Sequence, residues 1–254
     1  MEKREPAAVK INDPWNSLKQ FTDARIALGR AGSSIPLKQE LEFKLAHAHA
    51  RDAVYSLLNN EHLIKAISPL DLPLLQLHSQ AGNRQQYLQR PDLGRLLDNT
   101  SSQLVKDYAN ANDICIILAD GLSAGAINDH AAELLENLIP LLKGVNYKLS
   151  PICLAGQARV AIGDEIAYGL QAKFSVVLIG ERPGLSAADS IGAYLTYYPK
   201  PGLTDESRNC VSNIRKQGLS FHLAAEKIFY LIQEAFKRKL SGVELKDNAG
   251  LLDS

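Results

Sequence analysis

Residues 174–179 read FSVVLI and end at Gly180, and residues 114–118 read ICIIL. Both runs are apolar on two faces and rich in β-branched side chains, which is typical of strands buried inside a parallel sheet. Weaker patterns predict a strand, a turn and a second strand at 153–162, and a strand at 193–197 (AYLTY). These runs decide the fold, because a sheet buried on both faces needs helices above and below it.

Helical patterns alternate with these strands. Ser123 is expected to cap a helix that continues to about Leu142, and a shorter and a longer helix are predicted at 163–170 and 220–240. Strands that alternate with helices predict an α/β domain with a three-layer parallel sheet, Rossmann-like or flavodoxin-like, over residues 111–254.

The preceding part of the chain has mainly helical periodicity, and we expect a helical N-terminal domain at 13–110. A disordered arm at 1–12 is expected before it. The domain itself is predicted to hold a short helix opened by Asp13 and Pro14, a long helix at 37–58, strands or irregular connections at 63–90, and a helix at 91–109.

The composition excludes several classes of protein. The 254 residues carry 28 Lys and Arg and 28 Asp and Glu, so no basic surface for nucleic acid is expected. No apolar run approaches the roughly 20 residues that span a bilayer. The opening MEKREPAAVK lacks the apolar core of a signal peptide, and the cysteines Cys115, Cys153 and Cys210 form no CxxC pair. A cytoplasmic protein is expected, and a net charge of zero favours a subunit of a larger assembly.

Three loops are predicted at the carboxyl ends of strands, where open parallel sheets bind ligands. They are 119–123 (ADGLS), 180–185 (GERPGL) and 209–213 (NCVSN). Each has an ordinary interpretation as well: a turn before a capped helix, a surface turn, and a small inert thiol at Cys210.

Signatures of catalysis and of metal binding are missing. The sequence contains no GxGxxG after a strand and no GxxxxGK[ST], and Ser123, within GLSAG at 121–125, has no obvious base. His47 and His49 stand two apart on a predicted helix and therefore point in different directions. The residues alone indicate an α/β domain with a ligand-binding mouth, without catalytic residues and without a metal site.

Seven segments, taken together, carry a family resemblance. They are DPWNSL (13–18), TDARIALGRAG (22–32), LAHAHARDAV (45–54), RPDLGR (90–95), ADGLSAGAI (119–127), VVLIGERPGLS (176–186) and RNCVSNI (208–214). In this order and spacing they resemble the small, or light-chain, subunit of ethanolamine ammonia-lyase, an adenosylcobalamin enzyme.

The resemblance implies a complete enzyme that converts ethanolamine to acetaldehyde and ammonia by radical chemistry, begun by homolysis of the cobalt–carbon bond. It implies a separate large TIM-barrel subunit that holds the substrate and the reacting residues. The small subunit would cover the corrin ring at the interface with residues 111–254, within an oligomer of large–small heterodimers.

The family's cobalamin contacts fall on Val160, Glu181 and Cys210, with the closest local matches at the last two. Corrin is a broad apolar disc with amide side chains, whose N–H groups could donate to Glu181 or to backbone carbonyls near Val160 and Cys210. Gly180 and Gly184 would then let the backbone approach the ring.

The binding mode expected from the resemblance is base-on. Proteins that bind cobalamin base-off need an Asp-x-His-x-x-Gly motif, and no histidine of this sequence has glycine three residues later. The family also includes enzymes packaged in bacterial microcompartments through a longer N-terminal extension. Only about a dozen residues precede the matching region, so a free cytoplasmic enzyme and an encapsulated one both remain open.

Residues 25–32 (RIALGRAG) have two interpretations. They form either a basic turn on a solvated surface or a docking surface with two arginines, and the resemblance favours docking. Two functions other than the one implied by the resemblance also fit an α/β domain of this kind. One is a flavodoxin-like oxidoreductase that binds a nucleotide or flavin, and the other is a non-catalytic assembly subunit.

Overall fold

A computed structural model describes residues 13–22 and 24–247, so the arm predicted at 1–12 lies outside the described residues. In chain order the elements are η1 (Pro14–Gln20), α1 (Leu37–Tyr55), α2 (Asn60–Ile67), η2 (Ser68–Leu70), β1 (Leu74–His78), α3 (Arg84–Gln89), η3 (Leu93–Arg95), α4 (Asn99–Asp107), β2 (Asn112–Ala119), α5 (Ala124–Gly144), β3 (Ile152–Gly156), α6 (Ile162–Gly169), β4 (Ala172–Gly180), β5 (Ile191–Tyr197), η4 (Asp205–Ser207), β6 (Arg208–Ile214), α7 (Phe221–Arg238) and η5 (Gly242–Glu244).

The sheet has six strands in the order β1-β3-β2-β4-β5-β6. The first four are parallel, whereas β5 runs antiparallel to β4 and β6 antiparallel to β5. The prediction of a parallel sheet is therefore wrong for its last two strands. The connection at 181–190 is shorter than the dozen or more residues that a parallel crossover needs, so the chain returns directly.

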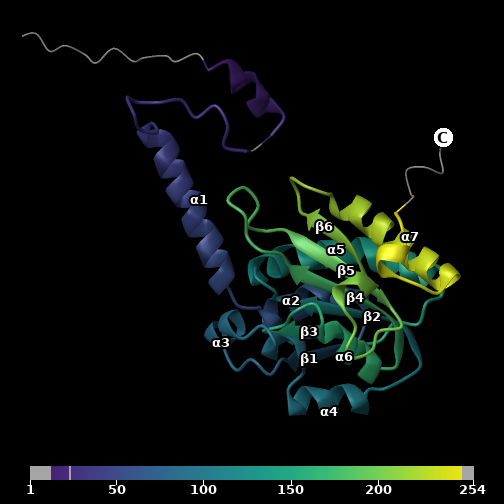
Figure 1. The fold of residues 1–254 in the computed structure, drawn as a ribbon. Helices are drawn as coiled ribbons and strands as arrows, with labels where there is room; N and C mark the ends of the chain where they lie inside the picture. The colour runs from purple at the N-terminus through teal and green to yellow at the C-terminus, as the bar shows by residue number, and fades with distance from the viewer. Residues whose placement is uncertain (1–12, 23, 248–254) are drawn as a thin grey trace, which may run out of the picture.

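Helices cover both faces of the sheet, α5 and α7 on one side and α4 and α6 on the other (Figure 1). Successive side chains of β4 point to opposite faces of the sheet, which explains why there are two cores. Val176 and Leu178 belong to the core under α5 and α7, whereas Val177 and Ile179 belong to the core under α6. The strands β2 and β4 were predicted from apolar runs, and their side chains thus contribute to two separate cores.

Two segments of the sheet differ from the sequence predictions. Residues 209–213, predicted as a loop, lie inside β6, which pairs with β5. Strand β1 comes from the part assigned to the helical domain at 13–110, yet it pairs in parallel with β3. The sheet therefore begins well before residue 110, and the division of the chain at that point stays a prediction.

Most helix predictions agree with the structure, with differences at their ends. Asp13 accepts the Trp15 N–H at 2.9 Å and caps η1 as predicted. Ser123 precedes α5 but makes no capping bond, because its hydroxyl donates to the Ala188 carbonyl at 2.8 Å. The helix predicted at 91–109 divides into η3 and α4, and the second strand predicted within 153–162 is replaced by a turn into α6.

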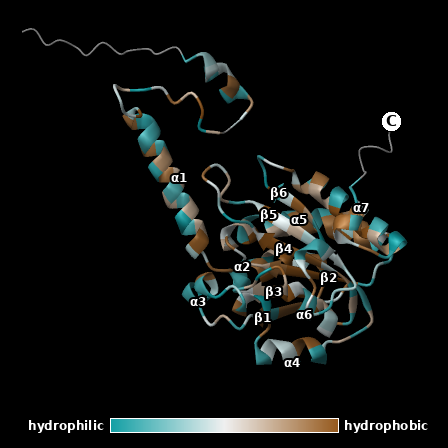
Figure 2. Ribbon diagram, viewed as in Figure 1, coloured by the Kyte–Doolittle hydropathy of each residue, from teal (hydrophilic) through white to brown (hydrophobic). Residues whose placement is uncertain are grey.

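Helix α1 projects away from the sheet and has no buried residue (Figure 1). Leu37, Leu41 and Leu45, four residues apart, are 68%, 55% and 57% exposed. Figure 2 shows hydrophobic, brown positions interspersed with hydrophilic, teal ones along α1. The stripe lacks a partner within the part of the chain that the structure describes. None of the described helices combines the length and the apolarity needed to cross a bilayer.

Candidate functional site

A cavity of about 470 Å³ lies where the carboxyl ends of β2 and β4 meet the turn after β3. It is lined by Tyr87, the 121–122 turn, the 159–160 turn, residues 179–182 and Tyr194. Its size is in the range of small-molecule sites. Two of the three loops predicted to bind ligands, 119–123 and 180–185, meet in this cavity.

Asp120 holds the turn that carries the cavity residues Arg159 and Val160. Its carboxylate is 1% exposed and accepts the backbone N–H groups of Gln157 and Ala158 at 2.7 and 2.8 Å. Burial raises the pKa of Asp120, while these two N–H groups and Arg84 act in the opposite direction. The Asp120-Gly121 pair is thus more than a turn, because it fastens the end of β2 to the segment that follows β3.

Tyr87 is fully buried between two guanidinium groups. The guanidinium carbon of Arg84 lies 4.7 Å from the ring centre and that of Arg159 lies 4.3 Å from it. The Tyr87 hydroxyl donates to the Ala158 carbonyl at 3.2 Å, and burial raises the pKa of this phenol well above its usual value. The stack therefore fixes the direction of Arg159 at the cavity wall.

Arg84, on the other face of Tyr87, has partners within the chain for most of its guanidinium group. Its Nη1 lies 3.7 Å from Asp120 Oδ2 and donates to the Gly121 carbonyl at 2.9 Å, and its Nε donates to the Val54 carbonyl at 2.6 Å. Arg84 thereby ties the end of α1 to the strand end at the cavity.

Two glycines at the cavity allow neighbouring backbone segments to lie very close together. Gly121 has φ +55°, and a Cβ there would lie 2.3 Å from the Gly180 carbonyl oxygen. A Cβ on Gly180 would lie 2.0 Å from the Ser123 carbonyl oxygen, whereas one on Gly184 would make only ordinary contacts. Gly180 is therefore required because the backbone of the neighbouring turn lies against it. The sequence had suggested a different reason, that this glycine lets the backbone approach a ligand.

Glu181 lies across the ends of β5 and β6. Its N–H donates to the Ser190 carbonyl at 3.0 Å, and its Oε2 accepts the Asn213 N–H at 3.1 Å. A Cβ on Gly192 would lie 3.1 Å from its Oε1, so the glycine leaves room for the carboxylate. Glu181 is half-buried and keeps Oε1 available at the cavity.

Cys210 and Tyr194 are paired across β5 and β6. Cys210 is exposed, and desolvation of its thiol, with the nearby charge of Glu181, raises the pKa of Cys210. Burial, with a smaller effect of Cys210, raises the pKa of Tyr194 to about 12. Both groups are neutral at physiological pH, so Cys210 offers shape and polarity and no nucleophilic thiolate.

Val160 is half-buried and packs against the core under α6, and its carbonyl accepts the Gly163 N–H at 3.1 Å. The structure thus brings the three predicted residues to one mouth: Val160 and Glu181 line the cavity, and Cys210 lies next to its wall residue Tyr194. Sequence reasoning missed Tyr87, Arg159 and Tyr194. Arg159 stands directly before Val160, which is the one local signal that pointed to it.

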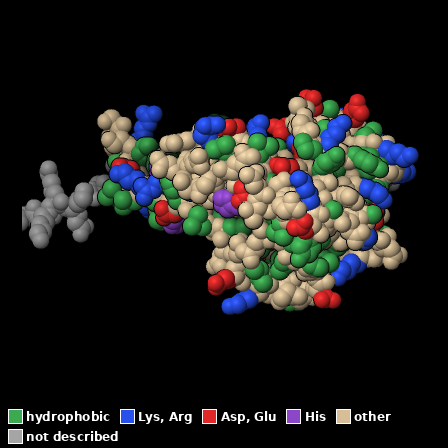
Figure 3. Space-filling model, turned by 90° about the horizontal axis from the view of Figure 1, so that it is seen from below, with side chains coloured by type: hydrophobic (Ala, Val, Ile, Leu, Met, Phe, Trp, Pro, Cys, Tyr) green, Lys and Arg blue, Asp and Glu red, His purple; other side chains and the backbone are tan. Residues whose placement is uncertain are grey.

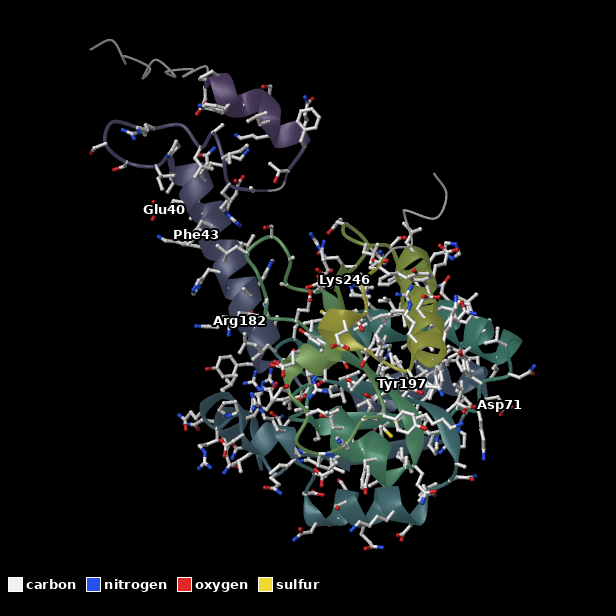
Figure 4. The ribbon with its side chains drawn as sticks, turned by 45° about the vertical axis from the view of Figure 1, so that its right-hand side comes forward. Glu40, Phe43, Asp71, Arg182, Tyr197 and Lys246 are labelled. Atoms are coloured by element: carbon white, nitrogen blue, oxygen red, sulfur yellow. The ribbon has the colours of Figure 1, made fainter. Side chains whose placement is uncertain are left out.

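The loop after β4 is also linked to the N-terminal segment. Arg25 donates to the Leu185 carbonyl at 3.3 Å, and its guanidinium lies 5.9 Å from the ring centre of Phe43 on α1. Figure 4 labels Phe43 and the exposed Arg182 of the loop. One of the two arginines predicted for docking is therefore engaged within the chain.

Charges and metal ligands give no further site. Basic and acidic side chains are interspersed on the face seen in Figure 3. Within residues 13–22 and 24–247, no group of three or more His, Cys, Asp or Glu side chains is placed to hold a metal ion.

Comparison with known proteins agrees with the resemblance. The sequence model of the ethanolamine ammonia-lyase light-chain family matches residues 12–246. The ethanolamine ammonia-lyase small subunit of Pseudomonas fluorescens SBW25 is 48% identical over 252 residues, which cover 97% of this chain and 91% of the relative. That of Ralstonia nicotianae is 49% identical over 248 residues, covering 96% and 92%.

The match extends through the predicted site segments and nearly the whole length of both proteins. Such identity over such coverage requires a common fold and a common family. The chain belongs to the ethanolamine ammonia-lyase light-chain family and is a small subunit of this lyase.

Proposed function

We propose that this chain binds adenosylcobalamin at the mouth formed by Val160, Glu181 and Cys210, against a large TIM-barrel subunit. The complex would deaminate ethanolamine to acetaldehyde and ammonia, with substrate and reacting residues on the large subunit. The observation that carries the proposal is that Val160 and Glu181, from separate segments, line one open cavity, and that Cys210 lies beside its wall residue Tyr194.

The residues at the mouth fit a corrinoid. The cavity combines apolar walls from Val160 and Ile179 with hydrogen-bonding groups, among them Glu181 and the buried Arg159 Nε that has no partner. A corrin disc is broad, apolar on its faces and fringed with amides, so it needs both kinds of contact. A cavity of about 470 Å³ encloses only part of such a disc, which favours a lid rather than a closed pocket.

This chain's own residues would bind and orient the cofactor. Glu181 offers Oε1 to an amide N–H while Oε2 stays on Asn213, and Cys210 and Tyr194 supply a neutral surface beside it. When bound, adenosylcobalamin supplies the radical chemistry that begins the deamination. No side chain of the mouth is proposed to react, and the lack of a His-x-x-Gly motif supports base-on binding.

A partner is needed on two grounds. Cys210, which pairs with the cavity residue Tyr194, is exposed on β6. In addition, the α1 stripe leaves Leu37, Leu41 and Leu45 in solvent, and an apolar row of this kind is typical of a contact surface. We assign the large subunit as the protein that covers both.

Reconstitution tests the proposal. The purified chain alone should show no ethanolamine deamination, and addition of the large subunit with adenosylcobalamin should restore acetaldehyde formation. Glu181→Gln should raise the cofactor concentration needed for half-maximal activity, whereas Glu133→Gln on the exposed face of α5 should not. Activity of the isolated chain, or a flavin spectrum with no corrinoid binding by the complex, would refute the proposal.

A further inference from the structure

Arg159 is a cation without a counter-charge. It lines the cavity of about 470 Å³ and an adjoining one of about 180 Å³. Within the described part of the chain it makes no ion pair and no side-chain hydrogen bond, and its Nε is buried without a partner. Because a buried donor without an acceptor is costly, this group is expected to meet an acceptor in the assembled enzyme.

The neighbouring carboxylates do not neutralise Arg159. Asp120 serves the Gln157 and Ala158 N–H groups and lies beside Arg84. Asp205, at the smaller cavity, has Oδ1 3.5 Å from Nε of Arg208.

Glu181, at the larger cavity, accepts the Asn213 N–H, and the next residue, Arg182, is a second cation at the wall. The cavity walls therefore keep an excess of positive charge, which favours an anionic group of a ligand.

The guanidinium is also held in place before any ligand arrives. Stacking on Tyr87 at 4.3 Å fixes its plane, and the Arg159 N–H donates to the Gly94 carbonyl at 2.7 Å, which fixes its backbone. A fixed planar fork suits a phosphate, whose oxygens accept two parallel N–H bonds.

We propose that Arg159 binds the phosphodiester of the cofactor's nucleotide tail. This inference rests on the proposed function and adds to it a residue and a ligand group. The periphery of cobalamin is otherwise made of amides, so the phosphodiester is the peripheral group that supplies a negative charge. The inference also explains why a guanidinium, rather than another donor, occupies this wall of the cavity.

The test compares two corrinoids on the apo complex of both subunits. Cyanocobalamin carries the phosphodiester, and dicyanocobinamide lacks the whole nucleotide tail. Binding of each is measured by equilibrium dialysis and corrin absorbance for the wild type, Arg159→Gln, Arg159→Lys and the control Arg238→Gln, which removes a cation from the exposed end of α7. Gel filtration confirms that each variant still assembles with the large subunit.

Arg159→Gln should weaken cyanocobalamin binding about tenfold or more, as expected for a lost charge-assisted hydrogen bond, and leave cobinamide binding unchanged. Arg159→Lys should recover part of the loss, and Arg238→Gln should behave as the wild type. Equal weakening of both corrinoids would overturn the inference, because Arg159 would then act through the fold or through a carboxylate of the large subunit. Unchanged cyanocobalamin binding would overturn it as well. Failure of the wild-type complex to bind either corrinoid would instead refute the proposed function itself.

Discussion

Replacing Asp120 by Ala tests whether one buried carboxylate builds the cavity. Asp120 accepts the Gln157 and Ala158 N–H groups at 2.7 and 2.8 Å at the foot of the turn that presents Arg159 and Val160. The alanine variant leaves both donors buried without an acceptor and removes the carboxylate beside Arg84, 3.7 Å from its Nη1.

The magnitude follows from these contacts. Each orphaned buried N–H costs about 1–3 kcal/mol. Part of this cost is offset because Asp120 itself is expensive to bury, as its raised pKa indicates. We therefore expect a net loss of about 2–4 kcal/mol in the free energy of unfolding, together with weaker corrinoid binding by the complex.

Urea unfolding followed by circular dichroism measures the first effect, and cyanocobalamin titration of the assembled complex measures the second. Asp129→Ala, at an exposed position of α5, is the matched control and should change stability by less than about 0.5 kcal/mol. An Asp120→Ala variant with wild-type stability and wild-type corrinoid binding would refute the view that this carboxylate positions the turn.

Three further predictions concern the frame of the site. Asp164 and Arg208 form a buried pair with two hydrogen bonds of 2.7 and 2.8 Å. In urea unfolding, Asp164→Leu alone should lower the free energy of unfolding by about 3–5 kcal/mol, because it leaves Arg208 buried without its partner, and the double variant Asp164→Leu, Arg208→Met should lower it clearly less. Equal losses in the two variants would contradict this. Gly180→Ala should cost about 1–3 kcal/mol because the added Cβ would lie 2.0 Å from the Ser123 carbonyl, and a neutral effect in thermal unfolding would show that the turn can yield. Burial opposes ionisation of Asp113, but the Lys148 N–H and Lys173 hold the pKa of Asp113 below its usual value. The stability lost in Asp113→Asn should be full at neutral pH, decline as the pH falls through the usual carboxyl range, and vanish below the lowered pKa of Asp113. A difference in stability that persists in strong acid would be inconsistent with this origin.

The strands that the sequence predicts well are those that are buried on both faces along their length. β2 and β4 are buried on both faces, and ICIIL and FSVVLI show this directly. β6 reads RNCVSNI, and its alternation is polar because one face is partly open, so the pattern indicates a loop. The direction of β5 is readable in principle, since 181–190 leaves no room for a crossover helix. Hydrophobic pattern alone, however, does not give strand direction.

The site was predictable only through the resemblance. Val160, Glu181 and Cys210 have no shared spacing or motif, and their proximity depends on β6 lying beside β5 and on the turn after β3. Tyr87 and Arg84 come from a separate helix, and nothing in their local sequence indicates a stack with Arg159. Contacts among side chains from distant segments follow from the tertiary fold, so local pattern could not reveal them.

The most direct test is the structure of the reconstituted two-subunit complex with cobalamin bound. We predict that the corrin ring contacts Val160, Glu181 and Cys210 within about 4 Å, with its other side against the large subunit. A corrin ring bound elsewhere, with these three side chains exposed to solvent or covered by protein alone, would contradict the proposed role of this mouth.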